Sequence, residues 1–271
     1  MQNEIFSEWH TDWKFGICRF PVLSLYREPV IGSGLTSQLL YGETYKVLGA
    51  SKDSKWIMVT GDREAGNGWI PTVQLHSISG DAYQNYQKDD FRIVSSPFGK
   101  VVVGGEPFYL LPGSIVHVSS SELFSIEEIV HMEGEFREFT NKANREELVK
   151  IALGFLRAPY LSGGRSYFGI NSGTLIHLVY KIGGYVVPNY LAGLLTFGKP
   201  ITQDVLQTGD IVLFANENNI PSHVGMYLGD KQLMEVKGAV QIRPFEPEDH
   251  KSVSNISRPN QVHQLLKIFP G

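Results

Sequence analysis

The amino-acid sequence predicts an α+β protein of two or three domains, in which a small all-β barrel precedes one buried helix on a sheet. Its length of 271 residues exceeds that of one small domain. Near the N-terminus, short β-rich runs alternate with Gly, Asp and Ser turns, as in small barrels. Near residues 172–182, an almost wholly apolar helical stretch precedes several short strand-like runs. That order is typical of a buried helix packed on a largely antiparallel sheet.

The composition is that of a folded chain with little net charge. Apolar residues make up 42 %, which allows a sizeable core, and a net charge of −4 gives no indication of nucleic-acid binding. One cysteine, Cys18, excludes an internal disulfide, and the histidines lack metal-ligand spacing, so we expect no metal and no cofactor. The sequence contains no run of about 18 apolar residues, so we expect no membrane span. Because no signal-peptide region is visible, we expect a cytoplasmic protein as the sequence stands, or a periplasmic or secreted one if a signal was removed.

Residues 14–78 are expected to form the barrel. Their β-rich runs are GICRFPVLSLY, YKVLGA, WIMVT and GWIP. The order of the segments resembles that of a bacterial SH3 domain. The segments are an apolar strand, Arg-Glu-Pro, SQLLYGE, Trp56 and a closing Gly-Trp-Ile-Pro. The resemblance implies a module that binds peptide or cell-wall ligands and flanks wall-active enzymes. Residues 79–143 carry further strand-like runs, and two interpretations stay open for them: a second, degenerate SH3-like barrel or a β-linker.

A third domain is predicted over residues 144–271. Helical spacing of apolar residues indicates a first helix over 144–157, with Asn144 and Glu147 as its capping residues. A second helix is predicted from about 172 to 182. The strand-like runs after it are DIVLFA, HVGMYLG, QLMEV, AVQIRPF and VHQLLKIF.

Four stretches, in order, make this third domain similar to the NlpC-type cell-wall cysteine peptidases, which have a papain-like fold. APYLSGGR at 158–165 resembles the family's Pro-Tyr-x-x-Gly-Gly motif, and Gly-Ile at 169–170 precedes the family's catalytic helix. TGDI at 208–211 and SHVGMY at 222–227 resemble its Pro-Gly-Asp-Leu motif and its histidine strand. With an SH3-like barrel in front, the chain is most similar to γ-D-glutamyl-L-diamino-acid endopeptidases. The implied partner is therefore a murein peptide or another peptidoglycan fragment.

The sequence departs from this family at the nucleophile. The resemblance implies Asp-Cys-Ser-Gly at the start of the second helix, where a helix N-terminus and a histidine activate the thiol. Here the residues at 171–174 are Asn-Ser-Gly-Thr, so Ser172 stands at the cysteine position. His223 matches the family's base, and Glu235 falls at its third polar group. A hydrolase that uses Ser172, His223 and Glu235 is therefore one interpretation.

Other positions of the family's substrate site have changed as well. Asn171 stands for the Asp that holds the substrate's amine, and Gly173 stands for the Ser that holds the D-Glu carboxylate. Tyr160 matches the family's active-site tyrosine, while Tyr26 and Glu28 fall in the barrel loop that leans over the family's groove. Our leading interpretation is a degenerate, inactive homologue that keeps the fold and binds a peptide or cell-wall fragment. A third interpretation is a non-catalytic scaffold that meets a protein partner through its SH3-like barrel.

Several of these residues also have a purely structural interpretation. Ser172 suits a helix N-cap, and Glu235 alternates within LMEVK in a way that can face solvent. His177 lies five residues after Ser172, off its helical face, so we expect a hydrogen-bonded core histidine. Cys18 is expected to be a small core residue.

Overall fold

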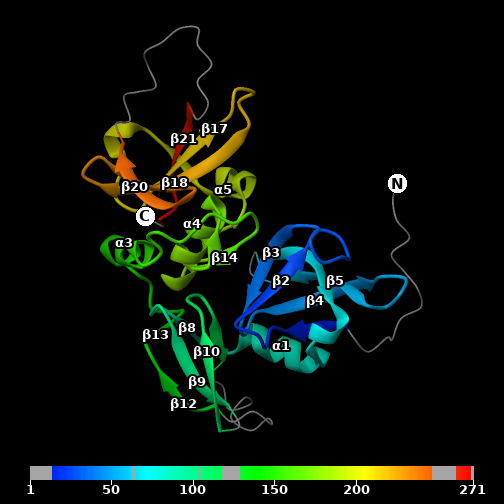
Figure 1. Ribbon diagram of the computed structural model, residues 1–271. Helices are drawn as coiled ribbons and strands as arrows, with labels where there is room; N and C mark the ends of the chain where they lie inside the picture. Colours follow the sequence, from blue (N-terminus) through cyan, green and yellow to red (C-terminus); the bar gives the residue numbers. More distant parts are fainter. Residues whose placement is uncertain (1–13, 63–64, 104, 118–128, 246–260, 270–271) are drawn as a thin grey trace. The chain divides into compact units, whose positions relative to one another are not determined.

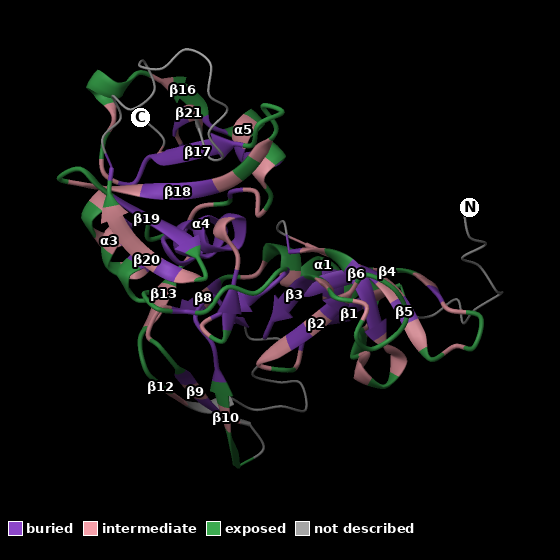
Figure 2. Cartoon of the chain, turned by 45° about the horizontal axis from the view of Figure 1, so that its top comes forward, coloured by how far each residue is buried: buried purple, intermediate pink, exposed green. Residues whose placement is uncertain are grey.

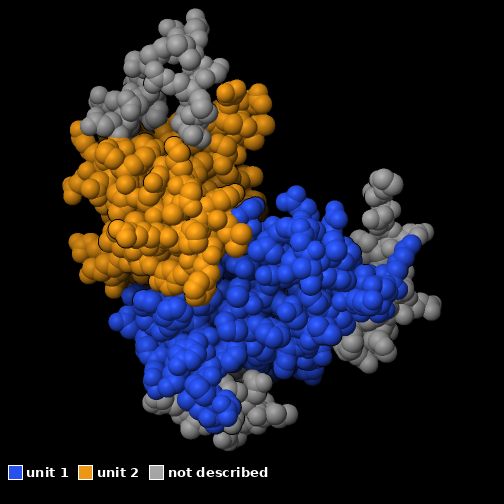
Figure 3. Space-filling view, in the orientation of Figure 1, with its two compact units in different colours: residues 1–141, 162–166 blue, residues 142–161, 167–271 orange. Residues whose placement is uncertain are grey.

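The computed structural model describes residues 14–62, 65–103, 105–117, 129–245 and 261–269 (Figure 1). Contacts divide the chain into two compact units, neither of which is contiguous in sequence (Figure 3). Strands and helices both contribute, so the predicted α+β class is confirmed. Among the described residues, no helix is long and apolar enough to cross a membrane. The first unit contains residues 1–141 and 162–166, and the second contains 142–161 and 167–271.

A seven-stranded sheet forms the N-terminal part of the first unit. Its strands are β1 Phe15–Ile17, β2 Val22–Tyr26, β3 Leu35–Leu40, β4 Thr44–Ala50, β5 Trp56–Gly61, β6 Gly66–Pro71 and β7 Ser77–Ile78, with a 3-10 turn η1 at Thr72–Gln74. They are paired in the order β3-β2-β6-β5-β4-β1-β7. Every second residue of β2 is buried, which is the pattern of a strand with one face on a core.

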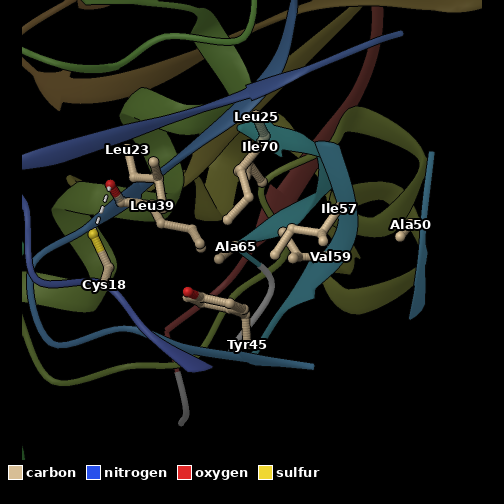
Figure 4. Close-up of a cluster of buried hydrophobic side chains, with 10 residues drawn as sticks. All are labelled: Cys18, Leu23, Leu25, Leu39, Tyr45, Ala50, Ile57, Val59, Ala65 and Ile70. Atoms are coloured by element: carbon tan, nitrogen blue, oxygen red, sulfur yellow. Dashed lines mark hydrogen bonds between the residues drawn. The ribbon is translucent and has the colours of Figure 1, made fainter. Parts of the chain in front are cut away.

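The core of this sheet is an apolar cluster that includes the one cysteine (Figure 4). Cys18 is fully buried, and its Sγ lies 3.3 Å from the Phe20 carbonyl oxygen and 3.8 Å from that of Leu39. Burial raises the pKa of the Cys18 thiol to about 12, so the group stays protonated and unreactive. The prediction that Cys18 is a core residue is confirmed.

Residues 79–141 begin with a helix that the sequence analysis did not predict. In this helix, α1 Gly80–Lys88, only Tyr83 is buried, so apolar periodicity gives little signal; its start is marked by Ser79, whose Oγ accepts the Ala82 N–H at 3.1 Å. Two three-stranded sheets follow. Their strands are β8 Phe91–Val94, β9 Gly99–Val103, β10 Glu106–Leu110, β11 Ile115–His117, β12 Ile129–Glu133 and β13 Phe136–Glu138. The sheet orders are β10-β9-β12 and β11-β8-β13, and an independent second barrel stays a prediction.

The first barrel meets these sheets at Gly42, where the two backbones approach closely. The Ile115 N–H donates to the Tyr41 carbonyl at 2.8 Å, and His117 Nε2 lies 3.2 Å from the Gly42 carbonyl oxygen. Gly42 has φ +79, and a Cβ there would lie 2.0 Å from the Ile115 oxygen. Only glycine therefore fits at this junction.

Residues 162–166 belong to the first unit through one buried ion pair. Arg165, which opens the short strand β14 Arg165–Ser166, is fully buried. Its two terminal nitrogens each lie 2.9 Å from a different oxygen of Glu43, and its backbone N–H donates to Gln38 at 2.8 Å. A bidentate contact of this kind fixes both charged groups in one geometry.

A six-stranded antiparallel sheet with helices forms the second unit (Figure 1). Its strands are β16 Lys199–Ile201, β17 Ile211–Ala215, β18 Pro221–Gly229, β19 Gln232–Lys237, β20 Ala239–Pro244 and β21 Gln261–Lys267, and the short strand β15 Gly169–Ile170 lies outside it. Its helices are α3 Arg145–Leu153, α4 Ser172–Ile182 and α5 Leu191–Phe197, with a 3-10 turn η2 at Gln203–Val205. The sheet order is β16-β21-β17-β18-β19-β20.

The helix α4 lies at the centre of this unit and contacts β18 and β19. Every residue of α4 after Ser172 is buried, as Figure 2 shows, and its bounds agree with the predicted helix. The first helix has the predicted capping box of Asn144 and Glu147. It ends at Leu153, earlier than predicted, because the chain continues in tight turns from Gly154.

Candidate functional site

The start of α4 is closed by a capping box. Asn171 is the N-cap: its Oδ1 accepts the Thr174 N–H at 3.0 Å, and Thr174 Oγ1 accepts the Asn171 N–H at 3.1 Å. Ser172 is the first helical residue, so the expectation that it caps the helix is wrong. Asn is as good a cap as Ser, and Thr174 supplies the return bond. Ser172 is half-buried.

His223 and Glu235 meet on the sheet beside α4. The register pairs Gly225 with Glu235, and His223 is two residues from Gly225, so both side chains lie on one face. His223 Nε2 lies 3.2 Å from Glu235 Oε2. Only 7 % of the Glu235 side chain is exposed, so the interpretation that it faces solvent is wrong.

A third residue, Arg243 on β20, completes this contact. Its Nε lies 3.0 Å from the other oxygen of Glu235. Burial by itself raises the pKa of Glu235. The hydrogen bonds from His223 and Arg243 together have the larger effect, and the pKa falls to about 2. Glu235 is therefore an anion held between two partners. Sequence reasoning missed Arg243, although period-two alternation across the tight turn at Gly238 would have placed it diagonally opposite Glu235.

The loop before α5 fills the space at Gly173. A Cβ on Gly173 would lie 2.6 Å from the Asn189 carbonyl oxygen, so no side chain fits there without moving the loop. His177 Nδ1 lies 2.7 Å from the Val187 carbonyl oxygen, in the same loop. His177 is 2 % exposed, which confirms the prediction of a hydrogen-bonded core histidine.

Tyr160 lies next to the segment that leads into α4. Its backbone bridges Ile170, and its N–H donates to the Gly238 carbonyl at 2.8 Å. The residue is 55 % exposed and thus accessible to a ligand. Within the second unit, the structure therefore gathers Tyr160 and residues 171–173 at the start of α4, and His223 and Glu235 on the strands that α4 contacts.

The two remaining candidates, Tyr26 and Glu28, belong to the first unit. Tyr26 ends β2 and packs edge-on against Trp56, with ring centroids 5.5 Å apart. Glu28 lies in the following loop, where its backbone N–H donates to Ser33 Oγ at 3.1 Å. A ligand contact by either residue stays a prediction. In the described ranges of the chain, no cluster of three or more His, Cys, Asp or Glu is placed to hold a metal ion.

We expect acid to weaken the second unit through Glu235. Its folded-state pKa of about 2 lies below the ordinary 4.5, so its stabilising contribution is complete above the ordinary value and lost as pH falls towards the folded one. Glu235→Gln lacks this contribution. The difference in unfolding free energy between wild type and variant should therefore narrow from about pH 5 to about pH 3. Urea unfolding followed by circular dichroism measures it, and a difference that stays constant over this range would contradict the assignment.

Comparison with known proteins agrees with this architecture. The NlpC/P60 family matches residues 157–257, and the bacterial dipeptidyl-peptidase SH3 domain matches residues 25–75. Dipeptidyl-peptidase 6 of Lysinibacillus sphaericus is 26 % identical over 230 residues, which cover 76 % of this chain and 81 % of that protein. The gamma-D-glutamyl-L-lysine dipeptidyl-peptidase of Bacillus subtilis (strain 168) is 25 % identical over 220 residues, which cover 74 % of this chain and 71 % of the relative.

A solved structure shows the same fold. The crystal structure of an NlpC/P60 family protein from Bacillus cereus ATCC 10987 superposes with a TM-score of 0.71 at 19 % identity, covering 85 % of this chain and 94 % of that one. The strands of the first unit and the helix-on-sheet arrangement of the second are thus those of known domains. The chain combines a bacterial dipeptidyl-peptidase SH3 domain with a domain of the NlpC/P60 family.

Proposed function

We propose that the second unit binds a peptide of the murein type at the start of α4 and does not cleave it. The relatives that are γ-D-glutamyl-L-lysine dipeptidyl-peptidases support the ligand class. The exposed ring of Tyr160 offers an accessible contact surface beside α4. His223 adds a ring that is held in one orientation by Glu235.

The observation that carries the proposal is the state of Ser172. A serine nucleophile needs a base within hydrogen-bond reach, because its hydroxyl has little anionic character at neutral pH. Within the described ranges, the Ser172 hydroxyl has no hydrogen bond, and the contact of His223 is with Glu235. Gly173 is backed by the Asn189 carbonyl, so the neighbouring position offers no side chain to a substrate. Binding without turnover accounts for both features.

A second candidate is a hydrolase that uses Ser172, His223 and Glu235. The observation in its favour is the 3.2 Å contact between His223 and Glu235, since a carboxylate that orients the imidazole is what a serine-based triad requires. Catalytic hydrogen bonds also tighten when substrate binds. Activity therefore has to be measured together with binding.

We expect L-Ala-γ-D-Glu-diaminopimelate and L-Ala-γ-D-Glu-L-Lys to bind the purified protein without being hydrolysed. Isothermal titration calorimetry measures binding, and mass spectrometry of the same mixtures measures product. Ser172→Ala should keep the affinity within about fivefold, because a contact of one neutral hydroxyl contributes about 1 kcal/mol or less. His223→Ala should weaken binding, since it removes the oriented ring.

Three results decide between the candidates. Product that disappears in both Ser172→Ala and His223→Ala would establish the hydrolase and refute binding without turnover. Strong cleavage gained by Ser172→Cys alone would refute the interpretation that the family's substrate site is degenerate, because it would mean that the rest of the peptidase site is intact; it would leave binding without turnover as the property of the wild type. Neither binding nor product would refute both and leave a scaffold role for the barrel.

A further inference from the structure

A segment from far along the chain lies against the end strand of the barrel sheet. The strand β3 is the last in the seven-stranded order, and the short strand β14 contacts it. Residues 162–166, which include β14, belong to the first unit, although the residues on both sides of them belong to the second. The open edge of an end strand is a place where proteins bind peptide segments, and here it holds a piece of the same chain.

The contact is built around the side chain of Arg165, which is fully buried. Its two terminal nitrogens each lie 2.9 Å from a different carboxylate oxygen of Glu43. One of these nitrogens also donates to the Gln38 carbonyl on β3, and the Arg165 backbone N–H donates to Gln38 Oε1 at 2.8 Å. The Leu40 N–H holds the Glu43 carboxylate in place at 2.8 Å. A planar fork of N–H donors fits these acceptors, whereas the ammonium of a lysine does not.

A glycine lets the backbone of the segment approach β3. Gly163 has φ +75, and a Cβ there would lie 2.7 Å from the Leu35 carbonyl oxygen. Any other residue at 163 is strained at this φ and overlaps the backbone of the strand. The site therefore selects a glycine two positions before the arginine.

The loop that presents this segment is closed at its base. The Leu161 N–H donates to the Ile170 carbonyl at 3.1 Å, and the Ile170 N–H donates to the Pro159 carbonyl at 3.0 Å. A Cβ on Gly169 would lie 2.5 Å from the Leu161 Cβ, so the two ends of the loop are in contact. Closing a loop in advance lowers the entropy that is lost when its tip is bound. Residues 162–166 are thus a preorganised ligand.

We propose that β3 and Glu43 form a recognition site for a Gly-x-Arg segment, and that the barrel binds residues 162–166 of its own chain as the ligand of this site. The guanidinium is the recognised group, and the Glu43 carboxylate is its main acceptor. While residues 162–166 are bound, this face of the barrel is closed to a ligand from another molecule. The recognition lies within the first unit and does not depend on peptide binding by the second.

Chemical rescue tests the recognition of the guanidinium. Arg165→Ala removes from the side chain the atoms of N-ethylguanidinium and leaves a space of that shape beside Glu43. Millimolar N-ethylguanidinium should therefore stabilise the full-length variant. A ligand that binds only the folded state raises the ratio of folded to unfolded protein about elevenfold at ten times its dissociation constant. Tryptophan fluorescence in urea measures this ratio for the first unit, because all four tryptophans precede residue 70.

Three comparisons separate recognition from a general effect of the compound. N-ethylurea has nearly the same shape without the charge and should not stabilise Arg165→Ala. Wild type, whose site is filled, should not respond to N-ethylguanidinium. Glu43→Gln combined with Arg165→Ala lacks the acceptor carboxylate and should not respond either. Absence of rescue in Arg165→Ala, or an equal response in any of the three comparisons, would overturn the proposal.

Limited proteolysis tests whether the segment leaves a barrel that stays folded, in a chain that keeps its arginine. Trypsin cleaves after arginine, and the bond between Arg165 and Ser166 is protected while both residues are buried. Gly163→Ala introduces the overlap with Leu35 and should raise cleavage after Arg165 roughly tenfold or more. Lys46 on β4 is the internal reference, since trypsin reaches the backbone of this strand when the barrel unfolds.

A matched variant isolates the contact with β3 from backbone strain. Gly34→Ala places a side chain at a similar φ of +86 in the same barrel, with nothing within 4 Å of the new Cβ. It should leave cleavage after Arg165 at the wild-type rate. Unchanged cleavage after Arg165 in Gly163→Ala, or an equal rise after Arg165 and Lys46, would show that the segment is an inseparable part of the barrel and would refute the proposal.

Discussion

Glu43→Gln should lower the unfolding free energy of the first unit by about 3–5 kcal/mol, the usual cost of leaving one buried charge without its partner. Glu43 and Arg165 are 2 % and 0 % exposed in their side chains, so water cannot solvate the guanidinium that remains. The carboxylate also accepts the Leu40 N–H at 2.8 Å, which adds a second loss. Arg165→Met should cost a similar amount, since it leaves the Glu43 charge buried.

Tryptophan fluorescence in urea measures this effect on the first unit alone. All four tryptophans of the sequence precede residue 70, so none reports on the second unit. Asp53→Asn is the matched control: its ion pair with Lys55 spans 3.8 Å on the open surface and should have no measurable effect. Glu43→Leu combined with Arg165→Met should recover much of the loss, because an apolar pair of similar volume removes both charges together. Equal effects of Glu43→Gln and Asp53→Asn would show that the buried pair is not a stabilising centre.

Gly173→Ser should destabilise the second unit by up to about 3 kcal/mol, the range found when atoms are forced into a packed site. A Cβ at 173 would lie 2.6 Å from the Asn189 oxygen, and that oxygen belongs to backbone that cannot rotate away. The loop is anchored by the contact of His177 with the Val187 carbonyl, so it resists displacement. The resemblance to the peptidase family implies a serine at this position. Introducing that serine here therefore lowers the stability of the second unit.

Thermal unfolding followed by circular dichroism measures this cost. Ser172→Cys is the matched control, because it changes the adjacent residue on the same helical turn without adding an atom near Asn189. It should leave the midpoint close to that of wild type. Hydrogen exchange of the α4 amides locates the effect, and faster exchange is expected only in Gly173→Ser. A variant as stable as wild type would mean that the loop before α5 moves easily, which would weaken our account of a closed position at 173.

The sequence predicted the elements with strong periodicity and missed those without it. The helix 172–182 was predicted at its full length because its own residues are apolar on nearly all sides. The burial of Cys18 and His177 was predicted because each lies in an apolar stretch. The helix α1 was missed because only Tyr83 of its residues is buried. Local signals detect elements that bury much apolar surface, and an exposed helix leaves only its capping residue.

The candidate site was predictable in its parts but not in its pairings. His223 and Glu235 were identified through a resemblance, yet their contact depends on the register of β18 on β19, which no local pattern fixes. Glu235 looked solvent-exposed because period two does not say which face is covered. The sequence analysis assigned the N-cap of α4 to Ser172, whereas Asn171 is the N-cap. Both residues cap well, and the position of Thr174, three residues after Asn171, decides between them.

The buried partner of Glu43 lies 122 residues further along the chain, and this separation sets an order for synthesis on the ribosome. At about 5–20 residues per second, Arg165 is made roughly 6–24 s after Glu43. Until then the barrel holds an uncompensated carboxylate and an unfilled Gln38 contact. The first unit therefore lacks this buried ion pair until the chain has been translated as far as Arg165.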